Sequence, residues 1–204
     1  MCYMLGMKNT KYASPLASLL HNPLFNACDA RILGIPSRML AYYCQKGMIE
    51  RVSRGVYRVL GAPTGVTLDL EELVMTALSI PHSVICLVSA LCYYNLTDQI
   101  MREYWIAVPN RDRSPKRLHA RIVRMRNITL GRMSVRIGKY RVKIFNKERT
   151  IIDAFRYLSH EVAIKALQIY LKGVGDTKPD LQKLSHYAAL LNVSIGPYIL
   201  AFTT

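Results

Sequence analysis

The chain is short of acidic residues, has no paired cysteine motif and lacks long apolar segments, and each shortage excludes a class of protein. Its 13 Asp and Glu face 28 Lys and Arg, which gives a net charge of +15 over 204 residues. No segment approaches the ~18 uninterrupted apolar residues of a membrane-spanning helix. The N-terminus shows no basic start followed by an apolar stretch of signal-peptide length. We therefore predict a cytoplasmic protein with no membrane contact.

The cysteines form neither a metal-binding pattern nor a disulfide pattern. They are odd in number and include no C-x-x-C pair, and most lie among apolar residues: Cys2, Cys28, Cys44, Cys86 and Cys92. Zinc sites and disulfide frameworks need cysteines at paired spacings. We therefore predict reduced core thiols and no metal site.

Catalytic motifs are missing as well. The histidines are isolated, the acids are scattered, and no H-x-x-x-H, G-x-S-x-G or Walker loop occurs. Glu103 or Asp112 near Lys116 resembles the acid-and-lysine cluster of a nuclease only weakly. Ser89 is more typical of a helix N-cap, and Asp153 of a helix cap or a salt bridge within its helix. We predict that the protein is not an enzyme and needs no cofactor; a nucleic-acid-processing enzyme targeted by a DNA-binding module is the alternative.

The basic charge is unevenly distributed. The net charge is +6 over residues 1–65, −4 over 66–100, +12 over 101–150 and +1 over 151–204. A field of this sign favours a polyanion such as DNA, RNA or an anionic membrane. Two separate basic regions therefore flank an acidic, apolar stretch.

The first basic region has the pattern of three short helices. The first is predicted over residues 14–20, with Ser14 as a candidate N-cap. The second is predicted over residues 25–34, which carry apolar side chains at helical spacing. The third helix begins after its N-cap Ser37, continues through Lys46 and ends at Gly47, which supplies a left-handed stop.

Beyond Gly47 the apolar period changes from helical to alternating. Residues 48–52 and 56–60 predict two strands joined by a tight turn at Gly55. Three helices followed by such a hairpin are the elements of a winged helix-turn-helix, which we assign to residues 1–62. The glycine- and proline-containing linker at 61–65 separates it from a second domain at 66–204.

In a winged helix-turn-helix the third helix enters the major groove of duplex DNA, and the hairpin contacts the adjacent backbone. Arg38 and Gln45 are the candidates for reading bases, because their side chains match guanine and adenine edges. The predicted DNA-binding residues are Ser37, Arg38, Met39, Tyr42, Gln45 and Lys46 on the helix and Arg51, Arg54 and Arg58 on the hairpin, with Arg54 at its tip.

The second domain is predicted to be mixed α+β. A helix over 68–79, a short apolar run over 83–88 and a helix over 89–94 precede strands at 104–108, 121–125, 133–137 and 140–145, and helices at 148–157, 161–171 and 181–191 follow. Basic and apolar residues alternate along the last three strands. This alternation predicts an antiparallel sheet with a basic face formed by Arg121, Arg124, Arg126, Arg136, Lys139, Arg141 and Lys143. A phosphate-binding surface, a merely solvated face and an RNA site remain alternatives.

Three segments resemble the AbiEi-type antitoxins of bacterial type IV toxin–antitoxin systems. Gly47–Arg58 is similar to the end of that family's winged domain. Val88–Leu91 with Leu96 is similar to its serine-alanine-leucine helix start, and Lys147–Asp153 to its E-R-T-hydrophobic-hydrophobic-D element.

The resemblance implies a transcriptional autorepressor of a phage-defence operon. Its N-terminal domain would bind an inverted-repeat DNA operator, with self-association on the DNA, and its C-terminal domain would be needed for antitoxicity. A type IV antitoxin opposes its toxin without a stable complex. A stand-alone regulator with no toxin partner and a protein-interaction scaffold are the alternatives.

Overall fold

The computed structural model divides the chain into two compact units. One consists of Met1–Ser79 with Arg136–Tyr140, and the other of Ile80–Val135 with Arg141–Thr204. The structure describes residues 12–20, 24–53, 55–61, 66–112, 119–173 and 178–203. Helices and strands occur in both units, which confirms the predicted α+β class. Most of the predicted linker lies outside the described residues, and the domain boundary there stays a prediction.

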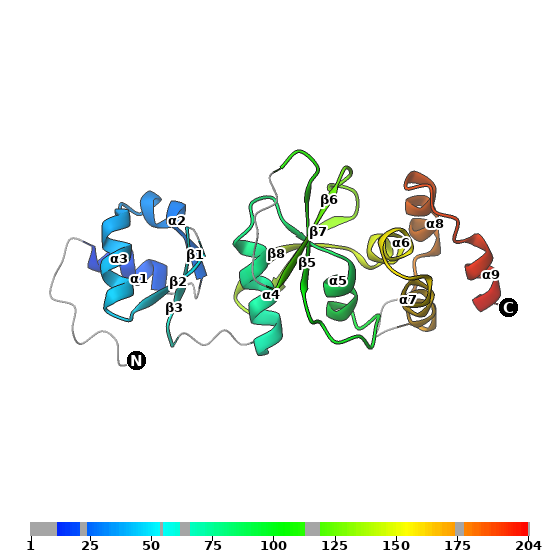
Figure 1. The fold of residues 1–204 in the computed structure, drawn as a ribbon, viewed down its shortest axis with the longest axis horizontal. Helices are drawn as coiled ribbons and strands as arrows, with labels where there is room; N and C mark the ends of the chain where they lie inside the picture. Colours follow the sequence, from blue (N-terminus) through cyan, green and yellow to red (C-terminus); the bar gives the residue numbers. More distant parts are fainter. Residues whose placement is uncertain are drawn as a thin grey trace. The chain divides into compact units, whose positions relative to one another are not determined.

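The first unit begins with short helices and short strands (Figure 1). These are α1 (Ala13–Leu20), β1 (Leu24–Asn26), α2 (Ala27–Ile32), α3 (Ser37–Gln45), β2 (Ile49–Ser53), β3 (Val56–Val59) and α4 (Leu68–Leu78). The strands form an antiparallel sheet in the order β1-β3-β2. The predicted helices and hairpin are therefore present, and β1 is an addition.

The start of the second helix differs from the prediction. Phe25 lies in β1, where it pairs with Tyr57 of β3, and α2 begins only at Ala27. The rings of Phe25 and Tyr57 stack with centroids 5.7 Å apart. The Asn26 N–H donates to the Asp29 carboxylate at 2.8 Å, which satisfies a backbone group at the helix start. Tertiary pairing therefore overrides the helical spacing at Phe25.

Two predicted N-cap residues lie inside their helices. α1 already includes Ser14, and Ser37 is the first residue of α3, whose N-cap is Pro36. Shifts of one residue are common at helix ends, because capping patterns locate a terminus only approximately. The predicted stop after α3 is confirmed, since Gly47 has a φ of +66°.

An apolar core holds the N-terminal helices α1 to α3 against the small sheet. Buried side chains from each of these helices and from each strand of the sheet meet in it: Leu16, Leu19, Phe25, Ala30, Ile35, Leu40, Tyr43, Ile49 and Tyr57. Each fully buried large apolar side chain contributes roughly 1.5–3 kcal/mol. This core fixes the orientation of α3.

A five-stranded sheet in the order β6-β5-β4-β8-β7 is the centre of the rest of the chain. The strands are β4 (Val84–Ile85), β5 (Tyr104–Pro109), β6 (Ala120–Met125), β7 (Arg132–Ile137) and β8 (Tyr140–Phe145). The helices are α5 (Leu87–Tyr93), α6 (Lys147–Tyr157), α7 (His160–Lys172), α8 (Leu181–Leu190) and α9 (Gly196–Thr203). The predicted strands and the three helices after them are confirmed, whereas α9 was not predicted.

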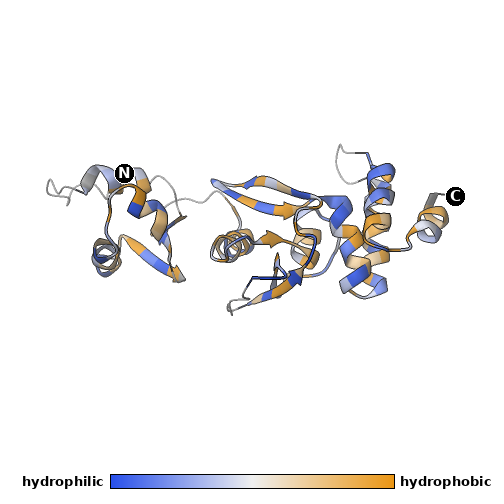
Figure 2. Cartoon of the chain, turned by 90° about the horizontal axis from the view of Figure 1, so that it is seen from above, coloured by the Kyte–Doolittle hydropathy of each residue, from blue (hydrophilic) through white to orange (hydrophobic). Residues whose placement is uncertain are grey.

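The predicted antiparallel sheet is wrong, because the sheet is mixed. β5 pairs with β6, and β4 with β8, in parallel, while β4 and β5 are antiparallel. Hydrophilic and hydrophobic positions alternate along some of the strands (Figure 2), and buried and exposed residues alternate along most of β8, as expected. Such alternation indicates which side chains share a face of one strand, but it does not indicate which strands are neighbours.

Ser89 does not cap its helix. The N-cap of α5 is Cys86, and Ser89 lies buried inside the helix. Its Oγ accepts a hydrogen bond from the Trp105 N–H at 2.8 Å. This contact links α5 to β5.

No helix in the described part of the chain is long and apolar enough to cross a membrane. Four cysteines lie in that part, and none of them is in a disulfide. Cys86 is buried, and burial raises the pKa of its thiol well above the usual value. Cys28 is exposed, so the prediction of core thiols is wrong for that residue; Cys2 lies outside the described residues.

Candidate nucleic-acid interface

Helix α3 has one buried face and one exposed polar face. Leu40 and Tyr43 are buried in the core of the first unit. The exposed residues recur at helical spacing on the other side, and they are Ser37, Arg38, Ala41, Tyr42, Gln45 and Lys46. A residue every third or fourth position forms one continuous stripe along a helix. Five of the six predicted helix contacts therefore lie on this stripe.

Met39 is the exception among the predicted contacts on α3. Its side chain is half-buried and packs against the core around Leu40. Ala41 takes a place on the exposed stripe instead, although it was not singled out in the sequence. An alanine has no polar group to mark it as a contact, so composition alone gave no signal for it.

Short connections fix both ends of α3. Gly34, with a φ of +77°, makes the turn from α2, and the next residue, Ile35, is buried and donates its N–H to the Ala30 carbonyl at 2.8 Å. At the other end, the Met48 N–H donates to the Tyr43 carbonyl at 3.1 Å. The exposed stripe is thus presented by a helix held at both termini.

Two polar side chains of the stripe form no hydrogen bond or ion pair within the described part of the protein. Among the described residues, Arg38 and Gln45 have no side-chain hydrogen-bond or ion-pair partner. The Lys46 ammonium lies 5.7 Å from the centre of the Tyr42 ring, so these two side chains share one end of the stripe. The stripe therefore carries two cations and an amide that can bind an external partner.

The hairpin presents fewer available cations than the sequence suggests. Arg51 is exposed on β2, opposite Tyr57 in the register. Arg54, the predicted tip contact, lies outside the described residues. Gly55, with a φ of +78°, takes the left-handed conformation predicted for the turn, and its carbonyl accepts a hydrogen bond from the Ala27 N–H at 2.8 Å.

Arg58 pairs with acidic residues of its own unit. Its Nη2 lies 2.6 Å from a carboxylate oxygen of Glu50, and its Nη1 lies 3.7 Å from Glu71. The hydrogen bond to Glu50 raises the pKa of Arg58 above its usual value. Two carboxylates therefore balance this charge, which leaves Arg58 less available to an external partner than Arg38.

The predicted second basic surface does not form one continuous face. Arg124 is exposed on one edge strand, β6, and Arg126 is exposed just after the end of that strand. Arg141 and Lys143 are exposed on β8, which β5 and β4 separate from β6. Arg136 and Lys139 are exposed too, and they belong to the other unit. The strand order therefore separates Arg124 and Arg126 from Arg141 and Lys143.

Arg121 lies apart from the other basic residues of β6. Its guanidinium is 4.3 Å from the centre of the Trp105 ring, and its Nη1 is 3.8 Å from Glu103. Because Arg121 and Arg124 are an odd number of residues apart, they lie on opposite faces of the strand.

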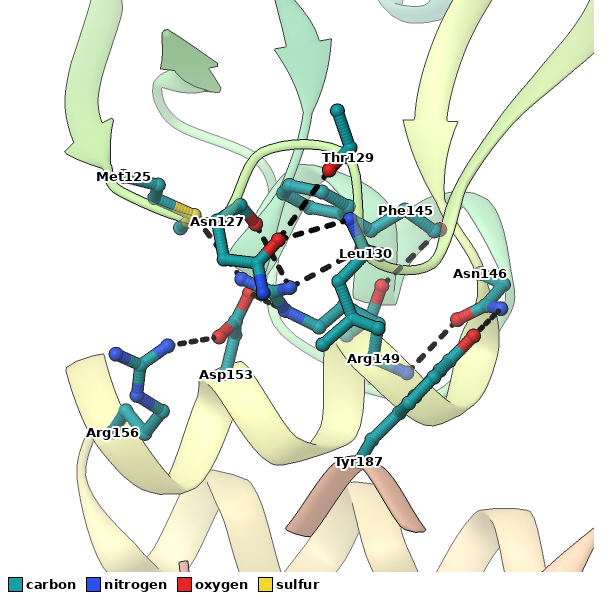
Figure 3. Close-up of polar contacts among 11 residues, drawn as sticks. Met125, Asn127, Thr129, Leu130, Phe145, Asn146, Arg149, Asp153, Arg156 and Tyr187 are labelled. Carbon is teal, nitrogen blue, oxygen red and sulfur yellow. Dashed lines mark hydrogen bonds and ion pairs between the residues drawn. The ribbon is translucent and has the colours of Figure 1, made fainter. Parts of the chain in front are cut away.

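The E-R-T segment of α6 is a buried network. Arg149 and Asp153 are fully buried, with Nε and Oδ2 2.7 Å apart, and Arg156 reaches Oδ1 of the same carboxylate at 2.9 Å (Figure 3). Arg149 also donates to the carbonyls of Asn127 and Leu130. Burial raises the pKa of Asp153, and the two arginines oppose that rise. The predicted salt bridge of Asp153 is confirmed.

Glu148, beside this network, is held by residues of later helices. The Tyr170 hydroxyl donates to Oε1 at 2.8 Å, and the Lys183 ammonium lies 3.1 Å from Oε2. The part of the chain that the structure describes contains no group of three or more His, Cys, Asp or Glu that could hold a metal ion. The acids of α6 thus stabilise the fold of the second unit.

Residues 15–60 match the model of a family described as transcriptional regulator, AbiEi antitoxin. The match includes α3 and both strands of the hairpin; Val88–Leu91 and Lys147–Asp153 lie outside it. No curated protein matches the chain. The predicted resemblance is therefore confirmed over residues 15–60, and this N-terminal segment is similar to the transcriptional regulators of the AbiEi antitoxin family.

Proposed function

We propose that the chain is a sequence-specific DNA-binding transcriptional regulator whose N-terminal part is a winged helix-turn-helix. The observation that carries the proposal is the exposed polar stripe of α3, which lies on a segment that matches a regulator family. The element order α1-β1-α2-α3-β2-β3 supports it, because a winged helix-turn-helix has this order. In the proposal α2, the turn and α3 are the helix-turn-helix, and β2 with β3 is the wing.

The proposed mechanism divides the stripe into base-reading and phosphate-binding side chains. Arg38 and Gln45 read base edges in the major groove, each with two possible hydrogen bonds to one base. Tyr42 and Lys46 bind phosphate and so set the position of the helix. Ser37 begins α3, where the positive end of the helix dipole favours an anion.

The wing adds contacts beside the groove. Arg51 is exposed on β2, and Arg54 follows β2 in the sequence, where the turn of the hairpin is predicted. A single helix reads only a few base pairs, so we propose that two copies bind an inverted repeat on double-stranded DNA.

We further propose that the protein is the antitoxin and autorepressor of a type IV toxin–antitoxin operon. The family match over residues 15–60 supports a regulator of this kind, and we assign antitoxicity to the second unit. In this account the protein acts in the cytoplasm and opposes the toxin without a stable complex.

The basic residues of the second unit can strengthen DNA binding without reading sequence. Arg141 and Lys143 are exposed on β8, and no acidic partner holds either of them within the described residues. We propose that they bind phosphate, which would add affinity and salt dependence but no specificity.

Binding of the purified protein to DNA from upstream of its own gene tests the proposal. Fluorescence anisotropy should show saturable binding, and Arg38→Ala and Gln45→Ala should each weaken it by about 1–3 kcal/mol, the range of a good bidentate base contact. Arg54→Ala should weaken binding to this DNA and to an unrelated duplex by similar factors, because a phosphate contact positions the protein and does not read a base.

Lys172→Ala provides the matched control, because Lys172 is an exposed lysine at the end of α7, outside the proposed interface. It should leave binding unchanged. Equal affinity of the parent, Arg38→Ala and Gln45→Ala would contradict the assignment of α3 to the groove.

A further inference from the structure

A cavity of about 380 Å³ in the second unit has no role in the proposed DNA binding. It lies where β6, α6 and α8 end, and Arg124, Arg126, Arg149 and Arg156 line it. Its size falls in the range of roughly 300–1,000 Å³ that is usual for small-molecule sites. It therefore has the volume and the charge for a small anionic ligand.

The arginines around the cavity differ in how many hydrogen bonds and ion pairs they form within the protein. Arg149 is fully buried and donates to Asp153 and to backbone carbonyls (Figure 3). Arg156 uses one nitrogen for Asp153, and its side chain is 31% exposed. Arg124 and Arg126 are exposed and have no acidic partner among the described residues.

The net charge at the cavity stays positive after the opposing charges are counted. Asp153 supplies one negative charge behind the wall, where Arg149 and Arg156 already bind it. The carbonyl ends of α6 and α8 together add about one negative charge, and this effect falls off within a helical turn. Four guanidiniums exceed these contributions. An anion is therefore favoured over a cation.

The rest of the wall suits more than a bare anion. Tyr157, Leu190 and Leu191 provide aromatic and aliphatic surface, and Tyr157 and Leu190 are 40% and 53% exposed. Asn110 and Asn192 add amide groups that can donate and accept hydrogen bonds. A site of this kind fits a ligand with a phosphate, an apolar ring face and hydrogen-bonding edges.

We propose that this cavity binds a nucleoside monophosphate, with the phosphate at Arg124 and Arg126 and the nucleoside against Tyr157 and Leu190. Guanidinium groups bind phosphate through paired, charge-assisted hydrogen bonds. An aromatic side chain can stack on any nucleobase, and an aliphatic side chain adds apolar contact. The proposal does not depend on DNA binding by α3.

Isothermal titration calorimetry of the full-length protein with 5′-AMP, 5′-GMP, 5′-CMP and 5′-UMP tests the proposal. At least one should bind saturably, and the corresponding nucleoside should bind at least about tenfold more weakly, since it cannot form the charged hydrogen bonds. Inorganic phosphate should also bind more weakly, because it lacks the nucleoside.

The double variant Arg124→Gln/Arg126→Gln should lose affinity for the nucleotide by at least about tenfold. Lys172→Gln/Lys178→Gln is the matched control, because it removes the same charge from exposed residues of the second unit that neither line the cavity nor belong to the proposed DNA contacts. It should keep parental affinity. Thermal unfolding of both variants checks that the fold is retained.

Four results would contradict the proposal, and each would identify the part that is wrong. No binding of any of the four nucleotides at millimolar concentration would exclude the site. Equal losses in the two double variants would indicate a general charge effect instead of a pocket. Nucleosides that bind as tightly as nucleotides would refute the phosphate assignment, and inorganic phosphate that binds as tightly would refute the nucleoside assignment.

Discussion

Arg38 in α3 and Arg149 in α6 both lie in the first turn of a helix, yet their surroundings are opposite. A cation is disfavoured at this position by about 0.3–1 kcal/mol, because the helix dipole is positive there. Arg149 is compensated inside the protein by Asp153 at 2.7 Å and is fully buried. Arg38 is exposed, with no such partner among the described residues. The comparison separates an arginine that stabilises the fold from one available to a ligand.

Removing the partner of the buried arginine should have the largest effect. Asp153→Asn leaves the Arg149 charge uncompensated in the interior, so the free energy of unfolding should fall by about 3–5 kcal/mol. Urea denaturation followed by circular dichroism measures this. The control is Asp98→Asn, which breaks the exposed ion pair with Lys165 and should leave the free energy of unfolding nearly unchanged. Similar losses in both variants would contradict the role of burial.

The backbone around Arg149 gives a second comparison. A Cβ added at Gly131 would lie 2.6 Å from Cβ of Arg149, and the φ of Gly131 is +69°. Gly173 has a similar φ of +80°, but an added Cβ there would meet no atom within 4 Å. Gly131→Ala should therefore cost about 1–3 kcal/mol more than Gly173→Ala, because only the former adds overpacking to backbone strain. Equal thermal stabilities of the two variants would mean that α6 shifts to accommodate the added Cβ, and this would contradict the predicted overpacking.

The variants Arg38→Ala and Arg58→Ala should differ in their effects on DNA binding and on the stability of the first unit. Arg58→Ala breaks the ion pair with Glu50, which is partly exposed, so it should lower stability by at most about 1 kcal/mol. Arg38→Ala should leave stability within about 0.5 kcal/mol of the parent, while weakening binding to DNA. Anisotropy and denaturation measured on both variants check this. A greater weakening of DNA binding by Arg58→Ala than by Arg38→Ala would reverse the assignment.

The smallest effect is expected from the basic residues of β8. If Arg141 and Lys143 bind phosphate, Arg141→Gln/Lys143→Gln should reduce the slope of log affinity against log salt by roughly 0.9 for each phosphate that is no longer neutralised. Sequence preference should not change. An unchanged slope would mean that this part of β8 does not touch DNA.

Much of the fold follows from periodicity in the sequence. Alternating residues identify β5 to β8, and glycines with positive φ, such as Gly47 and Gly55, mark the end of α3 and the turn of the hairpin. The buried and exposed faces of α3 also follow from helical spacing, apart from Met39. These features depend on interactions within one helix, strand or turn, so the local sequence pattern is enough to predict them.

Features that depend on distant residues could not be predicted in this way. β1 exists because Phe25 pairs and stacks with Tyr57, which lies 32 positions later in the chain. The separation of Arg124 from Arg141 depends on the strand order, and the pairing of Arg58 depends on the register of β2 and β3. The last helix, α9, lacks the charged residues that would mark an exposed face.

The ratio of specific to nonspecific DNA binding tests the central claim about α3 most directly. Affinities of the parent, Arg38→Ala and Lys46→Ala should be measured at one salt concentration for the operator and for a scrambled duplex of equal length. Arg38→Ala should lower the ratio, with the difference between the two binding free energies falling by about 1–3 kcal/mol, because the variant no longer recognises one base. Lys46→Ala should weaken both complexes alike. A ratio unchanged by Arg38→Ala would contradict the claim that this face of α3 reads the sequence.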